Sequence, residues 1–399
     1  MSLRQSSNYL GPAQLWTLAA GPFVLGIDGF VLAGLLPQLA NELGVSIAQA
    51  GQLTTLFALV YAVASPMIAI LTGRWERRRL LVLGMAIFAA GMLFQAAGSS
   101  FVMVAVGRIV AALGAATFQA NAYAVAGVLA SETTRPRNLA AVALGTSLSL
   151  VAGLPFGVAI GSWLGWRASI WLLLVLALLV GALLGSLPKV KIAAIGFRTR
   201  LAALRQSAVL RLLISTLLAL TPAYLILSYL PSIVPDSGGM IIIAMLCFGA
   251  GQVIGTRLVV PLITRFGDWP TFLGGAIATP LVLILLSVTQ QSSVLASLSL
   301  LLLGGCVGVL IVPQQQRLFS LIPDLAPIAL GFNGSASYIG SAVGAGLGGL
   351  VLAGSPTGWL APAAAITAVV TLGLVFALAP ERTTAKHPQE HSGRTEDPS

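Results

Sequence analysis

The chain has 399 residues, of which 57% are hydrophobic and 8% charged, and its formal net charge is +10 at pH 7. Ordinary soluble domains carry about 25% charged residues, so this composition excludes a soluble globular protein. The excess of basic residues does not indicate a nucleic-acid partner, because the Lys and Arg residues lie in short segments between apolar runs rather than on one soluble face.

Apolar runs of roughly 18 to 25 residues recur along the chain, and each is long enough to cross a hydrocarbon core about 30 Å thick. They predict an all-α polytopic membrane protein with twelve transmembrane helices. The first run is interpreted as a retained span, because it is longer than a signal-peptide core and lacks an Ala-x-Ala-type cleavage site. The predicted spans are 15–36, 49–72, 80–98, 101–124, 138–162, 166–187, 209–230, 239–263, 270–288, 294–312, 328–352 and 359–379.

Basic residues gather on one side of these spans, and the loops on the other side contain only Arg167. The positive-inside rule then places both termini in the cytoplasm. An even number of spans agrees with this, because it puts both termini on the same side. The segment 1–14 is the cytoplasmic N-terminus, and 380–399 has the composition of a disordered cytoplasmic tail. The residues that define the basic side are Arg74, Arg77, Arg78, Arg79, Arg135, Arg137, Lys189, Lys191, Arg198, Arg200, Arg205, Arg265, Arg382 and Lys386.

The longest internal connection, 188–208, is a basic cytoplasmic linker that divides the chain into two halves of six spans. The first half covers 15–187 and the second 209–379. The stretches FVLAGLLPQL and YLILSYLPSI are similar, and Pro37 of the first matches Pro231 of the second. Such a pair of parallel repeats indicates two pseudo-symmetric halves related by an axis along the membrane normal.

Four stretches resemble signatures of the major facilitator superfamily, and within it the bacterial twelve-span drug or metabolite:proton antiporters, which include the arabinose-type and sugar efflux permeases. In the order of the chain they are ILTGRWERRRLLVLG, GRIVAALGAATFQANAY with Arg108, GTSLSLVAGLPFGVAIGSWLGWR and NGSASYIGSAVGAGLGG. The resemblance covers residues 15–379 and implies the major facilitator fold. It also implies a multi-pass protein of the inner membrane that takes part in efflux and multidrug resistance.

The first of these stretches lies where the family has Gly-x-Leu-Ala-Asp-Arg-x-Gly-Arg-Arg. Gly73 occupies the place of the acid, and Glu76 that of a glycine. The resemblance implies a cytoplasmic gate that holds the halves together when the transporter is open outward. The alternative is that these arginines only orient the protein and contact anionic lipid. The predicted gate residues are Arg74, Arg77, Arg78 and, as an acidic partner, Glu132.

The third stretch matches the antiporter signature, which implies a hinge or rocking surface in the fifth span. Gly153, Gly157 and Gly161 are spaced by four and share a helix face, so a neighbouring backbone can approach closely. Pro155 removes a backbone hydrogen bond and permits bending. Ordinary packing of small residues is the alternative. The predicted hinge residues are Gly145, Gly153, Pro155, Gly157 and Gly161.

Asp28 is the only acidic residue deep inside a predicted span. A charge there costs about 2.5–3.5 kcal/mol on insertion scales, so it is expected to face a cavity and a partner. At 1.5 Å per residue, Asp28 lies ~12 Å below the outer end of its span and Arg108 ~10 Å below the outer end of another. In the family fold both spans line the central cavity, so we expect Asp28 and Arg108 to form a proton-coupling pair. A static pair that orders the first half is the alternative.

Further polar and aromatic residues within the spans are candidates for the substrate cavity. Buried amides need hydrogen-bond partners or water, so the alternative for each is a bond between helices. A mostly apolar cavity suits neutral or cationic amphiphiles. We interpret Arg257, near a cytoplasmic helix end, as reaching the interface rather than binding an anion. The candidates are Phe57, Tyr61, Gln119, Asn121, Tyr224, Gln252, Asn333 and Tyr338.

The leading prediction is a secondary active transporter, monomeric in the lipid bilayer, that exports a small molecule such as a drug, sugar or nucleoside in exchange for protons. No Gly-Lys-Ser/Thr phosphate loop appears, so ATP hydrolysis is not expected. No nucleophile with a base and no metal-ligand cluster lies in the spans, so neither an enzyme nor a cofactor is predicted. Pro388 separates His387 from His391 in the tail, which argues against a metal site there. The alternatives are a uniporter or importer, and a receptor or scaffold without transport.

Overall fold

The computed structural model describes residues 10–131, 134–190, 205–234, 239–322 and 326–379. Every regular element among these residues is a helix, and twelve helical segments are long and apolar enough to cross a membrane, which confirms the predicted fold class. The first six spans are built from α1 (Pro12–Gly34), α2 (Leu36–Leu43), α3 (Ile47–Leu71), α4 (Arg77–Ala97), α5 (Phe101–Val128), α6 (Arg135–Leu148), η1 (Ser149–Gly153), α7 (Leu154–Leu164) and α8 (Trp166–Leu184). The last six are built from α10 (Ser207–Ser228), η2 (Leu230–Ser232), α11 (Met240–Phe266), α12 (Asp268–Thr289), α13 (Ser293–Leu321), α14 (Ala326–Gly354), η4 (Thr357–Trp359) and α15 (Leu360–Ala377).

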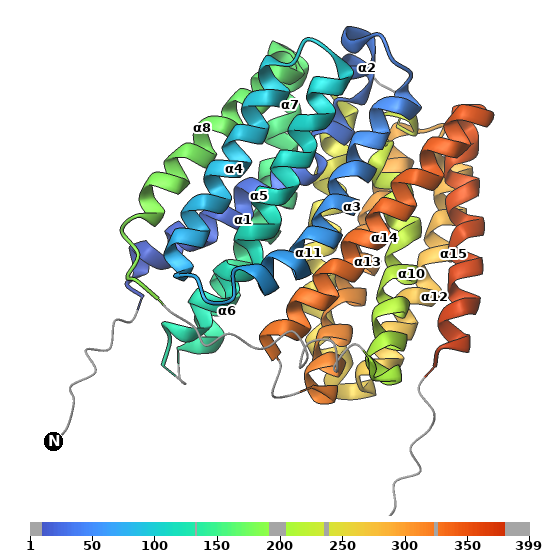
Figure 1. The fold of residues 1–399 in the computed structure, drawn as a ribbon. Helices are drawn as coiled ribbons and strands as arrows, with labels where there is room; N and C mark the ends of the chain where they lie inside the picture. Colours follow the sequence, from blue (N-terminus) through green and yellow to red (C-terminus); the bar gives the residue numbers. More distant parts are fainter. Residues whose placement is uncertain (1–9, 132–133, 191–204, 235–238, 323–325, 380–399) are drawn as a thin grey trace, which may run out of the picture.

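The helices of the two halves form two groups that lie side by side (Figure 1). Those of the first half, blue to green, occupy one side of the view, and those of the second half, yellow to red, occupy the other. Helices α3 and α14 meet between the groups. The exact division at 188–208 stays a prediction, because 191–204 lie outside the described residues.

The bundle has two chemically different ends. Helix α1 begins and α15 ends at the same end, where Arg77 begins α4 and Arg265 lies in the last turn of α11. We call it the basic end. The other end, here the opposite end, carries α2 and the turn between α7 and α8 at Gly165.

The short helix α2 was not predicted, because its residues were assigned to the end of the first span and its polar exit. Three buried apolar residues, Leu36, Leu39 and Ala40, fix one face of α2 on the bundle. Gly44, in the left-handed conformation with φ of 65°, ends it. Several helices also continue beyond the predicted spans: α13 reaches Leu321, because intrahelical bonds satisfy the backbone whether or not the side chains are apolar.

The fifth span is not a uniform α-helix. A π-helical turn, η1, lies between α6 and α7, and the backbone N–H of Leu154 bonds to the carbonyl of Ser149 five residues earlier. Pro155 follows directly. Its ring and its missing N–H are incompatible with a regular α-helical bond to the residue four positions before, so the wider turn accommodates it.

Candidate functional site

Asp28 and Arg108 form a direct ion pair inside the bundle. The distance from Arg108 Nη1 to Asp28 Oδ1 is 2.8 Å, and both side chains are fully buried. Arg108 also donates to the backbone carbonyls of Asp28 at 3.2 Å and Leu53 at 3.4 Å. One side chain of α5 therefore joins α1 and α3, which agrees with the depth match expected from the sequence.

The ion pair is only partly engaged. Asp28 Oδ2 and Arg108 Nη2 are buried and have no hydrogen-bond partner among the described residues. A carboxylate accepts through both oxygens, and a guanidinium donates through five N–H groups. The pair therefore keeps one free acceptor and one free donor while its existing bond stays intact.

Aromatic side chains from both halves surround the pair. The guanidinium of Arg108 lies 4.3 Å from the ring centroid of Phe57, a favourable cation–π contact. Tyr338, on α14 of the second half, lies with its ring centroid 3.9 Å from that of Tyr61 and 6.3 Å from that of Phe57. Three of the predicted cavity residues thus lie together, and Tyr338 brings the second half close to Phe57, the ring that contacts Arg108.

Helix α1 is positioned by the glycine face of the fifth span. A Cβ atom at Gly145 would meet the carbonyl oxygen of Ala19, and one at Gly153 would meet Ile27. Gly157 and Gly161 face Val31 and Leu35 in the same way. The glycines therefore allow α1 to lie directly against α6, η1 and α7, with Asp28 pointing away toward Arg108.

Four of the other predicted cavity residues are distributed over three places. Tyr224 and Gln252 line a cavity of about 40 Å³ between α10, α11 and α7, large enough for water. Asn333 accepts a hydrogen bond from Thr216 at 3.3 Å, which joins α14 to α10. Gln119 is half-buried on α5.

Asn121, another predicted cavity residue, makes its hydrogen bonds within the first half. Its Oδ1 accepts a hydrogen bond of 2.9 Å from Arg77, and its Nδ2 donates to the carbonyl of Thr117. Asn121 lies close to the basic end of α5, since α5 is long enough to carry it past the central aromatic residues. Its amide oxygen thus accepts a hydrogen bond from Arg77, a predicted gate residue.

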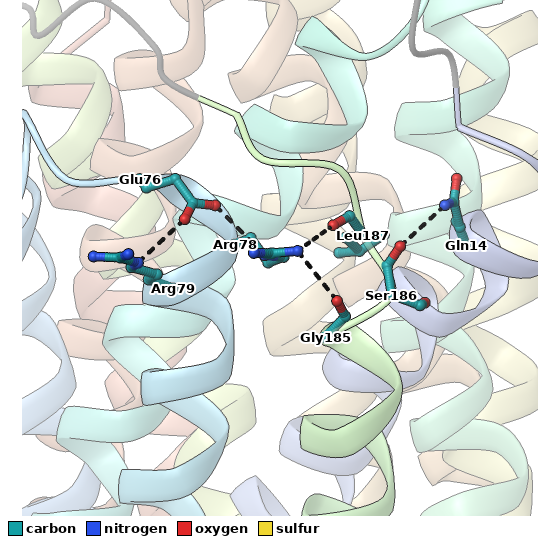
Figure 2. Close-up of polar contacts among 7 residues, drawn as sticks. All are labelled: Gln14, Glu76, Arg78, Arg79, Gly185, Ser186 and Leu187. Carbon is teal, nitrogen blue, oxygen red and sulfur yellow. Dashed lines mark hydrogen bonds and ion pairs between the residues drawn. The ribbon is translucent and has the colours of Figure 1, made fainter.

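The arginines between α3 and α4 have partners within the first half. Arg77 is buried and donates to the carbonyl of Gly73 at 3.0 Å as well as to Asn121. Arg78 donates to the carbonyls of Gly185 at 3.3 Å and Leu187 at 3.1 Å, which follow the last turn of α8 (Figure 2).

Glu76, which stands where the family signature has a glycine, is the acid that pairs with the neighbouring arginines. Its carboxylate lies 3.7 Å from Nε of Arg78 and 3.3 Å from Nε of Arg79 (Figure 2). Arg74 is exposed, and Glu132 lies outside the described residues. The gate between the halves therefore stays a prediction for an outward-open state.

Tyr229, a residue that sequence reasoning did not select, joins the two halves at the opposite end. Its hydroxyl donates to the carbonyl of Ala345 at 3.0 Å and accepts from Gln52 of the first half at 3.4 Å. A Cβ at Gly51 or at Gly349 would meet the Tyr229 side chain, so glycines of both halves make room for it. The one feature of the sequence that could have pointed to Tyr229 is the similarity of YLPSI to the end of the first span.

Arg167, on the first turn of α8, and Glu42, near the end of α2, form a second polar cluster at the opposite end. Arg167 pairs with Glu42, stacks on Trp166 at 4.4 Å and donates to the carbonyl of Gly98 at 2.6 Å. The indole Nε1 of Trp166 donates to Glu42 at 2.6 Å. These contacts tie α2, α4 and α8 together within the first half.

A family model described as Major Facilitator Superfamily matches residues 18–345. The chain is 33% identical over 388 residues to a chloramphenicol resistance protein of Streptomyces lividans, covering 93% of this chain and 97% of that protein. It is 29% identical over 379 residues to YbcL of Bacillus subtilis (strain 168), described as an uncharacterized MFS-type transporter, covering 92% and 94% of the two chains.

Solved transporter structures share the fold. A mutant of the nucleoside transporter NupG superposes with a TM-score of 0.73 at 13% identity, covering 92% of this chain and all of that one. A bacterial homologue of the human lysosomal transporter Spinster, solved inward-facing and unoccupied, gives a TM-score of 0.65 at 18% identity and covers 93% and 96%. Identities this low show a common arrangement of helices alone.

Proposed function

Because the chain belongs to the major facilitator superfamily and is a transporter rather than an enzyme, we propose that it exports small organic compounds in exchange for protons. The observation that carries the proposal is the buried pair of Asp28 and Arg108, whose guanidinium lies on Phe57, a ring that neighbours Tyr338 of the second half. The multi-pass chain then sits in the inner membrane with its basic end toward the cytoplasm, in agreement with the positive-inside rule.

Asp28 is the proton carrier in this proposal. A fully buried carboxylate is stable as an anion only while Arg108 is beside it. A proton that binds the free Oδ2 neutralises Asp28 and weakens its attraction to Arg108, and loss of the proton restores the pair. If the proton binds from one side of the membrane and leaves to the other, each cycle converts a pH gradient into a change in the packing around Arg108.

Tyr338 connects this change to the second half. Its ring contacts those of Phe57 and Tyr61, and the ring of Phe57 makes the cation–π contact with the Arg108 guanidinium. A shift of Arg108 therefore alters a contact that crosses between the halves. The contacts of Tyr229 at the opposite end support a conformation closed toward the outside, from which the protein opens when the halves rock.

The substrate class is inferred from the surroundings of the pair. Aromatic rings and the mostly apolar lining near Tyr224 favour a neutral, partly aromatic compound, and the free acceptor and donor of the pair suit a hydroxyl or amide group on it. The similarity to a chloramphenicol resistance protein supports the same class and the export direction.

The test is drug uptake into inside-out membrane vesicles with an imposed pH gradient, with labelled chloramphenicol as the first probe of a panel of neutral drugs. Wild-type vesicles acidified inside accumulate the drug, and an uncoupler abolishes the accumulation. Asp28→Asn keeps a hydrogen-bond acceptor beside Arg108 but has no titratable proton, so we expect at least a tenfold loss of gradient-driven uptake.

Asp268→Asn is the matched control, since this acid lies at the start of α12 away from the pair. It should accumulate drug as the wild type does. Gradient-driven uptake by Asp28→Asn at the wild-type rate would exclude Asp28 as the carrier. Equal drug flux with and without the gradient in the wild type would indicate a uniporter instead.

A further inference from the structure

A long groove lies on the outer surface of the second half, between α11, α12 and α13. It has a volume of about 480 Å³, and its lining is apolar except for Thr271 and Cys306. Its edge residues Ile254, Leu258 and Phe266 are each about half exposed, so the groove opens sideways toward the surroundings of the bundle. Those surroundings are the lipid bilayer.

The groove exists because side chains are missing from its floor. Cβ atoms at Gly251 and Gly255 on α11 would meet the carbonyl oxygens of Leu301 and Gly305 on α13, so these two helices already touch through their backbones. They cannot approach further to close the groove. On α12, a Cβ at Gly274 would meet no atom within 4 Å, which leaves open space along that wall.

The groove occupies the part of α11 that leads to the basic end. Its lining on α11 runs from Gly251 to Phe266, which is ~22 Å at 1.5 Å per residue. This length reaches from the boundary of the hydrocarbon core past the middle of a core ~30 Å thick. It therefore spans the whole leaflet at the basic end and reaches into the other leaflet.

The length and width of the groove indicate which kind of molecule can occupy it. The whole empty space of the groove, about 1000 Å³ up to and including its open side, has a mean cross-section of about 45 Å² over ~22 Å, whereas a helix with side chains is ~10–12 Å across and needs about 80 Å² or more. A helix of a second copy does not fit inside. A single hydrocarbon chain has the required slender shape and the required apolar surface.

A cationic side chain stands at the mouth of the groove. Arg265, in the last turn of α11, lies with its guanidinium 5.2 Å from the ring centroid of Phe266, which lines the groove. In the part of the chain that the structure describes, no ion pair engages Arg265, and the nearby acid Asp268 is associated with Arg317 instead. Arg265 is therefore available to a phosphate.

We propose that this groove binds one acyl chain of an anionic phospholipid from the leaflet at the basic end, with the lipid phosphate at Arg265. The acyl chain gains little hydrophobic energy on entering the groove, because it leaves one hydrocarbon environment for another. Retention of the lipid therefore depends on the fit of the chain in the groove, and the choice of headgroup depends on the charge of Arg265. One basic residue near the surface corresponds to about a fivefold preference for an anionic over a zwitterionic headgroup. The site is separate from the Asp28–Arg108 pair and does not depend on the proposed export activity.

The experiment is native mass spectrometry of the full chain, released from bilayers of equal phosphatidylglycerol and phosphatidylcholine. We expect the wild type to retain one lipid, with phosphatidylglycerol favoured about fivefold. Gly274→Leu places a side chain in the open groove and should remove the retained lipid. Gly373→Leu is the matched control, because Gly373 on α15 is also exposed and open, yet lies outside the groove.

Arg265→Gln should still retain one lipid, now without a headgroup preference. Thermal unfolding of each variant verifies that it is folded. The proposal is overturned if the wild type retains no lipid, or if Gly274→Leu retains the same lipid as Gly373→Leu. It is also overturned if Gly274→Leu abolishes dimers seen in the wild type, or displaces a transported drug rather than a lipid, since the groove would then serve a second copy or the substrate.

Discussion

Arg108 shows how a buried charge acquires its partners from several helices. It is held by the carboxylate of Asp28 on α1, a carbonyl of α3 and the ring of Phe57. The pair was predictable from the sequence because a single acid lies deep in the spans and a helix rise converts residue number into depth. The contact of Phe57 with Arg108, and that of Phe57 with Tyr338, was not predictable, since each depends on which helix faces meet.

Arg78 and Arg79 are adjacent, yet their surroundings predict different contributions to stability. Arg78 donates to two carbonyls after the end of α8, whereas Arg79 is 79% exposed and, among the described residues, pairs only with Glu76. Hydrogen bonds from a charged donor contribute about 1.5–3 kcal/mol, and exposed ion pairs about 0–1 kcal/mol. Because Arg78 is itself partly exposed, we expect Arg78→Ala to lower the free energy of unfolding by about 1 kcal/mol.

Arg79→Ala is the control and should change the free energy of unfolding by less than about 0.5 kcal/mol. Denaturant titration of both variants in the same detergent measures the difference. Equal effects of the two substitutions on the free energy of unfolding would show that the hydrogen bonds from Arg78 to the carbonyls of Gly185 and Leu187 do not stabilise the fold.

At the scale of elements, the fifth span combines a π-helical turn with a face of glycines against α1. The spacing of the glycines predicted close packing, and the structure identifies α1 as the partner. The π-helical turn could not be located from the sequence, because Pro155 permits a kink or a wider turn equally well. Whether this surface acts as a hinge stays a prediction.

Gly145→Ala tests the packing of α1. The new Cβ would meet the carbonyl oxygen of Ala19, a backbone atom that cannot rotate away. Overpacking of this kind costs about 1–3 kcal/mol, and the melting temperature should fall accordingly. Gly346→Ala, in the glycine-rich α14, is the control because its Cβ would meet no atom within 4 Å. A melting temperature for Gly145→Ala equal to that of Gly346→Ala would contradict the close approach.

At the scale of the whole molecule, the contact of Tyr229 between the halves at the opposite end is expected to control how the halves open. The Tyr229 ring lies between glycines of α3 and α14, and its hydroxyl bonds to both halves. Few other polar contacts join the two halves among the described residues. A small change at Tyr229 is therefore expected to shift the balance between conformations more than it changes the stability of either half.

Tyr229→Phe removes the hydroxyl and keeps the ring. Loss of about 1 kcal/mol of hydrogen bonding should increase the population open at the opposite end about fivefold. Spin labels at Ser46→Cys and Gly358→Cys, both exposed, report the distance between the halves after Cys247→Ala and Cys306→Ser remove the native thiols. We expect a larger fraction of long distances in Tyr229→Phe. An unchanged distance distribution would show that the hydroxyl does not hold the halves together.

The amino-acid sequence by itself determined the twelve spans, their grouping and the single deep acid. In a bilayer each helix satisfies its own backbone hydrogen bonds, so apolar length alone marks a span. Only the tertiary structure decided that Asn121 serves Arg77, that Arg78 holds the end of α8, and that Tyr229 joins the halves. These contacts join residues far apart in the chain, and they depend on which helix faces meet and at what height, which the hydropathy of one helix does not encode.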